Sequence, residues 1–319
     1  MILITGGMGF IGLHTARRLL DAGEDVVITR YRTWREPDFL KDEYGKRVQI
    51  ESVDTTSHHD VLGAALKHRV TGIVHLSVPA LAALTPAEDY RVNTDSLINV
   101  LEAGRLAGVK RVCVASSVAV YSTGLKEGPF REDMYLPLQS SNPTETWKKA
   151  EEIMGQHYAT RTGMEVVFMR IGGIYGPLYH SMANLPSRMT HAAVKGVPVN
   201  YGGGLRGGGV PYEEDGGDIC YVKDCALGIQ LLTMAETLNH RVYNVSGGVT
   251  VTNRQLASAV RQAVPGAQVE LRAGKGPGWR PHNYLDITRL TADTGYKPQY
   301  TVETAIADYV AWLRCGHEA

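Results

Sequence analysis

Short apolar runs alternate with amphipathic stretches along the first half of the chain, a pattern typical of strands and helices in turn. The runs that predict strands lie at residues 2–4, 26–28, 48–53, 72–76, 112–115 and 166–169. Stretches that predict helices lie between some of them, at residues 10–20, 94–107 and 148–159. Because strands joined through helices pair in parallel, we expect an α/β fold with a doubly wound parallel sheet covered on both faces.

The pattern changes after residue 176. Residues 177–217 are rich in loops, with a short helical stretch at 187–194 and a run of glycines within 202–209. We interpret the glycine run as a mobile loop, because no strand and helix flank it as they would flank a phosphate site. Strand and helix patterns return further on, at residues 219–222, 224–234 and 302–313.

The first strand runs into a glycine-rich segment, residues 6–12, which we call the glycine turn. Two spacings overlap in it, Gly6-x-x-Gly9-x-x-Gly12 and Gly7-x-Gly9-x-x-Gly12. Glycine lets the backbone approach phosphates closely, and the following helix start offers N–H groups and the positive end of a dipole. Strand, turn and helix together predict a dinucleotide site, whereas a tight turn without a ligand is the alternative.

The composition bounds the protein class. The 319 residues suit one large domain or a domain with a smaller lobe, and 33 basic residues balance 33 acidic ones. We therefore expect no nucleic-acid partner and no membrane partner. The first strand at residue 2 leaves no room for a signal peptide, and no apolar run reaches the roughly 20 residues that span a bilayer. The four cysteines lack metal-type spacing, so we expect no metal site and a reduced, cytoplasmic setting.

Short motifs follow one another along nearly the whole chain. They are the glycine turn, Asp54, Val74-His75-Leu76-Ser77, Asn93, Ser116-Ser117 with Tyr121, Arg170, Tyr175-Gly176-Pro177, Tyr221-Val222-Lys223-Asp224, Tyr243-Asn244-Val245 and Gly295-Tyr296-Lys297-Pro298. In this order the chain resembles the extended short-chain dehydrogenase/reductases, the NAD(P)-dependent epimerases/dehydratases that include UDP-galactose 4-epimerase. The resemblance implies a Rossmann domain at residues 1–172 plus 216–247. It also implies a smaller mixed α/β C-terminal substrate lobe at residues 173–215 plus 248–319.

The cofactor prediction depends on the residues after the second strand. A NAD site usually has an acid there, about 20 residues beyond the glycines, that bonds the adenosine ribose. This chain has Arg30, with Arg32 close behind. A guanidinium can instead clamp a 2′-phosphate, so we expect NADP, with NAD as the alternative and solvated surface arginines as the simplest interpretation. By resemblance, the other cofactor-binding residues are Gly6, Gly9, Phe10, Ile11, Gly12, Asp54, Thr55, Leu76, Ser77, Asn93 and Lys148.

Hydride chemistry at a carbinol needs a base that takes the hydroxyl proton. The resemblance implies a tyrosine base, a lysine four residues later that lowers its pKa, and a serine that bonds the same oxygen. Ser117 and Lys148 match the serine and the lysine, and Glu152 matches the acid of the family four residues further on. The tyrosine position, however, holds Thr144.

A threonine hydroxyl is far too weak an acid to replace a phenol. Aligning Lys149 as the lysine does not help, because the tyrosine position then holds Glu145. Three explanations stay open: another group carries the proton, the substrate itself has an acidic proton, or the chain binds cofactor as a redox sensor or scaffold without turnover. Candidates for another group are Glu145, Tyr121, Tyr135 and a side chain of the substrate lobe.

The substrate prediction depends on two departures from the family pattern. Members that act on nucleotide sugars usually have an asparagine where this chain has Gly173, and an arginine where it has Gly217. These departures favour a smaller hydroxyl or keto substrate, with a nucleotide-sugar epimerase or dehydratase as the alternative. Arg280 matches a family arginine that binds a substrate phosphate or carboxylate, and Ser116 and Ser117 complete the predicted substrate contacts.

The resemblance also implies a homodimer, which pairs the helix after Asn93 and the helix at Lys148 with their copies. Candidate residues for that interface, which could equally belong to the core, are Leu97, Val100, Leu101, Ile153 and Met154.

Overall fold

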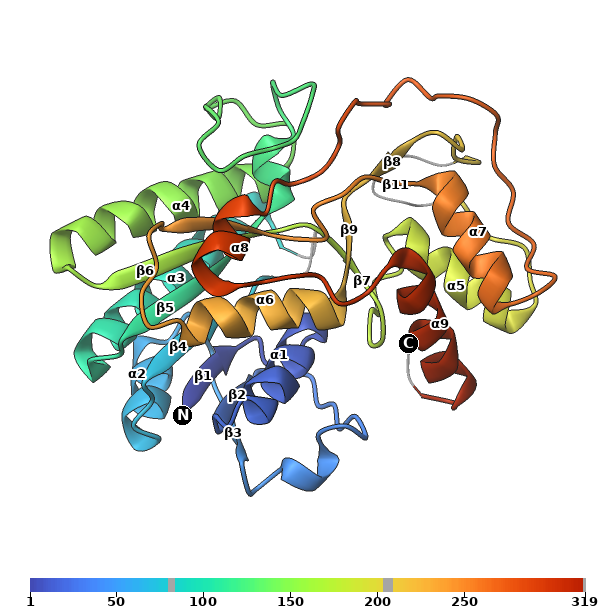
Figure 1. Ribbon diagram of the computed structural model, residues 1–319. Helices are drawn as coiled ribbons and strands as arrows, with labels where there is room; N and C mark the ends of the chain where they lie inside the picture. Colours follow the sequence, from blue (N-terminus) through green and yellow to red (C-terminus); the bar gives the residue numbers. More distant parts are fainter. Residues whose placement is uncertain (80–83, 203–208, 318–319) are drawn as a thin grey trace.

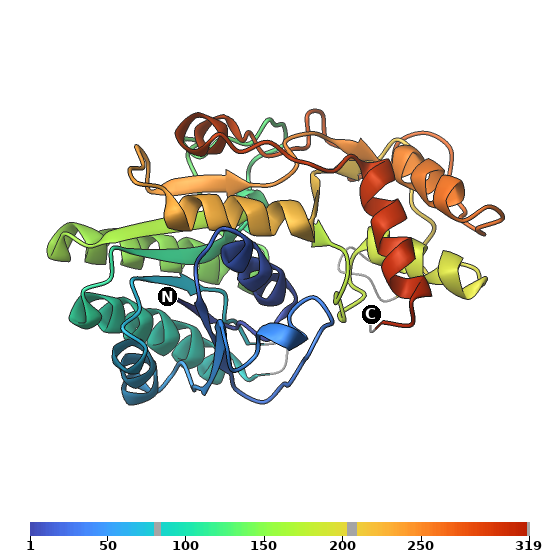
Figure 2. The ribbon, with the colours of Figure 1, turned by 60° about the horizontal axis from the view of Figure 1, so that its bottom comes forward.

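A parallel sheet flanked by helices forms the larger part of the molecule, and a second group of helices lies beyond one end of it (Figures 1 and 2). The computed structural model describes residues 1–79, 84–202 and 209–317. The predicted loop at residues 203–208 lies outside the described residues.

The central sheet has the order β10-β6-β5-β4-β1-β2-β3, and every neighbouring pair is parallel. Its strands are β1 (Ile2–Thr5), β2 (Val26–Arg30), β3 (Val48–Ser52), β4 (Gly72–His75), β5 (Arg111–Ser117), β6 (Glu165–Ile171) and β10 (Val242–Val245). The order reverses direction between β1 and β4, and such a switch point opens a crevice at the carboxyl ends of the strands. The sheet confirms the predicted doubly wound Rossmann fold.

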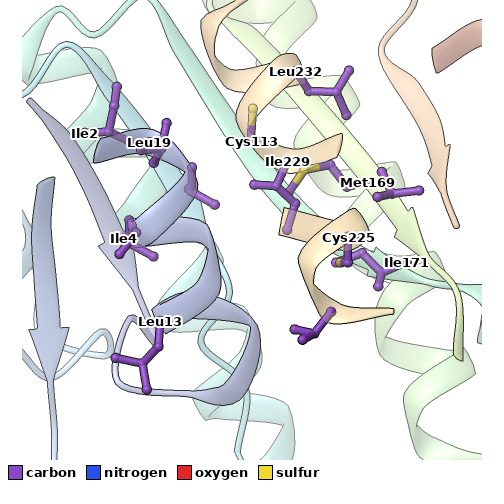
Figure 3. Close-up of a cluster of buried hydrophobic side chains, with 14 of the residues drawn as sticks. Ile2, Ile4, Leu13, Leu19, Cys113, Met169, Ile171, Cys225, Ile229 and Leu232 are labelled. Atoms are coloured by element: carbon purple, nitrogen blue, oxygen red, sulfur yellow. The ribbon is translucent and has the colours of Figure 1, made fainter. Parts of the chain in front are cut away.

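Helices cover both faces of the sheet. On one face α1 (Phe10–Asp21) packs against α6 (Val222–Met234), and on the other α3 (Pro86–Ala107) packs against α2 (His58–Lys67) and α4 (Pro143–Thr162). Figure 3 shows the apolar side chains that α1, α6 and the strands share in the core, among them Ile4, Leu13, Cys113, Met169, Cys225 and Ile229. Two short 3-10 helices, η1 (Lys41–Glu43) and η2 (Val118–Tyr121), follow β2 and β5.

The α3 and α4 helices both begin earlier than the apolar pattern predicts. The side chain of Thr85 caps α3, and the side chain of Asn142 accepts a hydrogen bond from the backbone N–H of Glu145 at the start of α4. Each cap is followed by proline at the first helical position, where no N–H is needed. The consequence for α4 is that Thr144 lies in its first turn, one turn before Lys148.

The second group of helices has a core of its own. It consists of α5 (Leu185–Lys195), α7 (Asn253–Ala263) and α9 (Val302–Arg314), which pack together around Met189, Leu256, Val260 and Ile306. Two short ladders join it to the sheet, β7 (Gly173–Tyr175) with β9 (Ile219–Tyr221) and β8 (Gly216–Gly217) with β11 (Val251–Thr252). The remaining helix, α8 (Thr288–Thr294), packs beside β10 and α6. This separate core agrees with the predicted lobe, whose boundaries stay a prediction.

The search for membrane spans gives a simple result. Among the described residues, no helix has both the length and the apolar character needed to cross a bilayer.

Candidate functional site

The glycine turn joins β1 to α1 at the carboxyl edge of the sheet. Gly6 has a φ of 66°, and a Cβ on it would lie 2.8 Å from the backbone nitrogen of Ser77. A Cβ on Gly12 would lie 2.7 Å from the carbonyl oxygen of Gly6. The N-cap of α1 is Gly9, whose lack of a side chain leaves the first turn uncapped, and no acid lies in that turn. These features fit a bound pyrophosphate, and the backbone of Leu76 and Ser77 lies close to Gly6 of the turn.

Arg30 ends β2 and is half-buried. Its guanidinium carbon lies 5.7 Å from the centre of the Trp34 ring. Arg32 is exposed and lies over the ring of its neighbour Tyr31, at 4.9 Å. Of the two predicted arginines, Arg30 is therefore the one that is half-buried at the end of a strand of the sheet.

Arg35 is a residue that the sequence analysis missed. Its Nη1 donates a hydrogen bond of 2.6 Å to the carbonyl oxygen of Met8, inside the glycine turn. The loop after β2 is thereby tied to the turn that would carry the phosphates. The available signal was the repeated arginine in Arg30-Tyr31-Arg32-Thr33-Trp34-Arg35.

The predicted residues after β3 are held by local hydrogen bonds. The Oδ1 atom of Asp54 accepts from the backbone N–H of Thr56 at 2.9 Å and from its hydroxyl at 2.7 Å. The hydroxyls of Thr55 and Ser96 are 2.7 Å apart, which ties this loop to α3. Asn93 is buried in α3, and its side-chain amide donates to oxygens one turn earlier in the helix.

A buried polar network follows the carboxyl ends of β5, β6 and β10. The guanidinium of Arg170 donates to both carboxylate oxygens of Glu152, at 3.0 and 2.7 Å, and to the hydroxyl of Tyr121 at 2.7 Å. That hydroxyl donates in turn to Asn244 at 2.9 Å, and the Ser116 hydroxyl donates to Glu152 at 2.5 Å. Burial raises the pKa of Tyr121 to about 12, against the lowering effect of the Arg170 charge. Tyr121 and Ser116 are thus engaged inside the protein.

Glu145 and Lys149 form a buried ion pair with many partners. Lys149 Nζ donates to Glu145 Oε1 at 2.7 Å and to the backbone carbonyls of Pro137 and Gln139, both at 2.7 Å. Burial opposes the charged form of Glu145, but hydrogen bonds outweigh this effect and lower the pKa of the carboxyl to about 2. The other donors to Glu145 are the backbone N–H groups and the hydroxyls of Thr123 and Ser141.

Lys148 and Glu151 form a second buried pair on the same helix. Their Nζ and Oε2 atoms are 2.8 Å apart, and the residues are 8% and 4% exposed. Burial raises the pKa of Glu151, while the charge of Lys148 limits the rise. The sequence analysis missed Glu151, although an acid three residues after a lysine lies on the same face of a helix.

His75 connects the Lys148 region with the glycine turn. It ends β4, and its Nδ1 lies 2.6 Å from the hydroxyl of Thr5, the residue before Gly6. Burial, helped by the positive charge of Lys148, lowers the pKa of His75 to about 3. His75 is therefore neutral at physiological pH, and it lies close enough to Lys148 to sense its charge.

Ser117, Thr144 and Tyr135 have fewer contacts. Ser117 ends β5 and is half-buried, and its hydroxyl accepts from the backbone N–H of Ala119 at 3.1 Å. Thr144 is half-buried in the first turn of α4. Tyr135 is 83% exposed, which places its phenol in solvent.

A cavity of about 430 Å³ lies where the C-terminal lobe faces the segment after β5. Arg280 lines it, and the guanidinium Nη2 lies 3.5 Å from the carbonyl oxygen of Ser122. Thr250 also lines it, with a buried hydroxyl that has no hydrogen-bond partner among the described residues. The other lining residues include Glu214, Thr252, Trp279, His282 and Tyr284. No group of three or more His, Cys, Asp or Glu residues within the described ranges could hold a metal ion.

The two positions that differ from nucleotide-sugar members lie at the entry to this lobe. A Cβ on Gly173 would lie 3.1 Å from the carbonyl oxygen of Asp218. A Cβ on Gly217 would lie 3.3 Å from Nδ2 of Asn283, which donates to the carbonyl of Gly216 at 2.7 Å. The side chain of Asn283 therefore occupies space beside the position where those members carry arginine.

Comparison with known proteins agrees with this architecture. The dTDP-glucose 4,6-dehydratase of Streptomyces griseus is 26% identical over 98% of this chain and 93% of its own length. The UDP-glucose 4-epimerase of Thermotoga maritima, solved with UDP-glucose, has a TM-score of 0.82 at 21% identity and 99% coverage of both chains. The UDP-glucose 4-epimerase of Thermus thermophilus, solved with NAD, has a TM-score of 0.74 at 26% identity and 98% coverage of both chains.

Residues 2–246 match the model of the NAD dependent epimerase/dehydratase family. The match covers well over half of the chain and includes every strand of the central sheet. It confirms the resemblance to the extended short-chain dehydrogenase/reductases, and with it the prediction of an enzyme that uses a nicotinamide dinucleotide. This chain belongs to the NAD dependent epimerase/dehydratase family.

Proposed function

We propose that this enzyme uses NADP(H) to carry out redox chemistry at a carbinol of a nucleotide sugar. The observation that carries the proposal is the place of Lys148. The charge of this buried lysine helps to lower the pKa of His75, and His75 bonds the residue that precedes the glycine turn. A buried lysine on α4 whose charge reaches the residue that ends β4 supports a role in work on substrate and cofactor together.

The nucleotide-sugar substrate replaces the smaller substrate that Gly173 and Gly217 favoured. The relatives described above are named for dTDP-glucose and UDP-glucose, and they match this chain from end to end. In this chain Arg280 in the 430 Å³ cavity supplies a cation for the diphosphate, and Asn283 offers an amide beside Gly217. Thr250 adds a buried hydroxyl that a ligand could satisfy.

The choice of NADP follows from the loop after β2. Its residues 30–35 include three arginines and no acid, and Arg30 and Arg35 both lie near the glycine turn or the strand that supports it. A carboxylate is what a NAD site uses to bond the ribose hydroxyls, whereas guanidinium groups suit a 2′-phosphate. The related Thermus enzyme was solved with NAD, so NAD is the alternative that the binding test must compare.

A bound nicotinamide would supply the hydride acceptor, and the protein would have to orient the carbinol and take its proton. We assign the orienting role to the hydroxyl of Ser117, at the carboxyl end of β5. Glu145 and Tyr121 are poor proton carriers, because each is committed to several internal hydrogen bonds. Tyr135 points into solvent and is equally unsuited.

We also propose a homodimer that pairs α3 and α4 with their copies. Three of the predicted interface residues, Leu97, Val100 and Leu101, are core residues of the sheet face. Ile153 and Met154, in contrast, are exposed on α4. Further exposed apolar side chains on α3 are Tyr90, Ile98 and Leu106.

The test of function combines cofactor binding with a substrate screen. Titrating NADPH and NADH against nucleotide-free protein should show tighter NADPH binding, and tighter NADH binding would contradict the cofactor proposal. UDP-, dTDP- and GDP-sugars are then incubated with the loaded enzyme, and sugar products are separated by chromatography. K148M is the inactive control. Tight cofactor binding without turnover of any sugar would instead support the sensor hypothesis.

A further inference from the structure

We propose that Lys148 and Glu151 together replace the missing tyrosine as the proton acceptor. Lys148 Nζ receives the carbinol proton, and Glu151 receives the proton that Lys148 gives up. This inference rests on the proposed redox function and names the groups that serve it. Lys148 would touch the substrate, whereas Glu151 acts through Lys148 and is a positioning residue.

The tyrosine of the family would lie on the face of α4 that carries Thr144. Thr144 and Lys148 are four residues apart, so they lie on one face of the helix. A threonine is shorter than a tyrosine by a phenol ring and has no useful acidity. Lys148 Nζ is therefore an ionisable atom on this face, one turn after the tyrosine position.

A lysine alone is a poor base while it carries its proton. Glu151 changes this, because its carboxylate lies 2.8 Å from Lys148 Nζ and both residues are buried. Low dielectric surroundings disfavour two separated charges, which makes transfer of a proton from ammonium to carboxylate easier than in water. The direction of the Glu151 pKa, raised by burial, agrees with this behaviour.

Among the described residues, Lys148 is the cation that pairs with Glu151. His75 from β4 is neutral, since burial holds its pKa at about 3. Glu152, next on α4, is committed to Arg170 and Ser116. From α3, Asp89 accepts a hydrogen bond of 2.7 Å from the Trp147 indole. These are the groups that a pH profile of the pair must take into account.

The proton step balances as follows. Lys148 Nζ passes one proton to Glu151 Oε2, and the carboxylate becomes a carboxylic acid. Nζ then uses its lone pair to accept the proton of the substrate hydroxyl as the carbinol carbon gives its hydride to the nicotinamide dinucleotide. The pair ends as an ammonium and a carboxylic acid, which return the protons when the hydride is delivered back.

The test compares E151Q with a matched control, E102Q. Glu102 forms an i,i+3 ion pair with Arg105 on the neighbouring helix α3, but that pair is half-exposed, and Glu102 contacts α4 through Tyr158, near the end of the helix away from the tyrosine position. E151Q should lower kcat by about 100-fold or more, with the KM for the sugar and the Kd for NADPH changed less than about threefold. E102Q should leave all three values near those of the wild type. The acidic limb of the pH profile of kcat should differ between the wild type and E151Q.

A rescue variant separates a chemical role from a structural one. Thr144→Tyr in the E151Q background restores the phenol of the family and should recover at least about tenfold of the lost kcat. A merely structural effect of E151Q would not respond to a phenol one turn away. Wild-type kcat in E151Q, or the same loss with no rescue and an unchanged pH profile, would overturn the proposal.

An infrared titration of the cofactor-free protein gives a readout that needs no turnover. Beside the bands of other buried acids such as Asp218, the wild type should show a carboxylic-acid band that titrates above the ordinary glutamate range and that E151Q lacks. Identical titrations would overturn the paired-proton proposal. If no nucleotide sugar is turned over but the Glu151 band is present, the substrate proposal fails while the proton pair stands.

Discussion

Two lysine–glutamate pairs lie side by side on α4, and they are built for opposite purposes. The Lys149–Glu145 pair has every oxygen and proton directed at a partner, including backbone carbonyls of the loop before the helix. Among the described residues, the Lys148–Glu151 pair has one ion-pair contact, at similar burial. The difference teaches that burial alone does not define a role. A pair with many partners holds the fold, whereas a pair with few partners among the described residues retains the capacity to move a proton.

The largest expected effect is on turnover. K148M removes the proposed proton acceptor, so kcat/KM should fall by about 1,000-fold or more. K149M should reduce turnover much less, because Lys149 serves Glu145 and the loop of Pro137 and Gln139. Steady-state kinetics of both variants are measured at a temperature where both are folded. A larger loss of turnover in K149M than in K148M would contradict the distinction between the two pairs.

Stability should show the reverse order. K149M leaves Glu145 buried and charged, which costs about 3–5 kcal/mol of unfolding free energy when a buried pair is broken. K148M should cost less, since Glu151 can become neutral by keeping a proton. Urea unfolding of the two variants at neutral pH measures both costs, and equal losses would contradict the distinction.

The pH dependence of stability sharpens the comparison. The pKa of Glu145 is lowered in the folded state to about 2 from 4.5, so its stabilisation is present above pH 4.5 and is lost as the pH falls towards 2. The pKa of Glu151 is raised, so its effect is opposite, and the folded state loses stability as the pH rises above the ordinary glutamate value. E145Q should therefore weaken the loss of unfolding free energy as the pH falls below 4.5. E151Q should weaken the loss of unfolding free energy as the pH rises above the ordinary glutamate pKa. Urea midpoints across this pH range give the slopes.

The smallest effect concerns one donor of the Lys149–Glu145 pair. T123V removes the hydroxyl that donates to Glu145 at 2.8 Å and should cost about 1 kcal/mol of unfolding free energy. NADPH affinity should not change, because this hydroxyl serves the pair and not the cofactor. Isothermal titration of NADPH alongside urea unfolding checks both parts. Weaker NADPH binding by T123V would contradict the assignment of Thr123 to the Glu145 pair.

The sequence could predict those parts of the site that depend on local geometry. Glycines at positions 6, 9 and 12 between a strand and a helix predict a phosphate turn, because only a residue without a Cβ fits where the backbone of Ser77 or Gly6 comes so close. The start of α4 was missed, since its first turn is polar and has no apolar periodicity. The Asn142 cap followed by proline was the signal that would have placed it.

The roles of the candidate proton carriers could not be predicted in the same way. Glu145 and Tyr121 are close to Lys148 in sequence, but both side chains are occupied by hydrogen bonds inside the protein. Some of these bonds come from residues far away in the chain, such as Asn244 for Tyr121. Glu151 was overlooked because a glutamate on a helix is usually a solvated one. Only the packing of α4 against the sheet and α3 buries it beside Lys148.

The sequence by itself therefore determined the parallel sheet, the glycine turn and the resemblance to the epimerase/dehydratase family. These follow from residue spacing, which acts over a few neighbouring positions. The tertiary structure alone decided which of two adjacent lysines faces which glutamate, and which carboxylate lacks other donors. Such matters depend on contacts between segments far apart in the chain, where burial and hydrogen-bond partners, and not residue type, set the charge of each group.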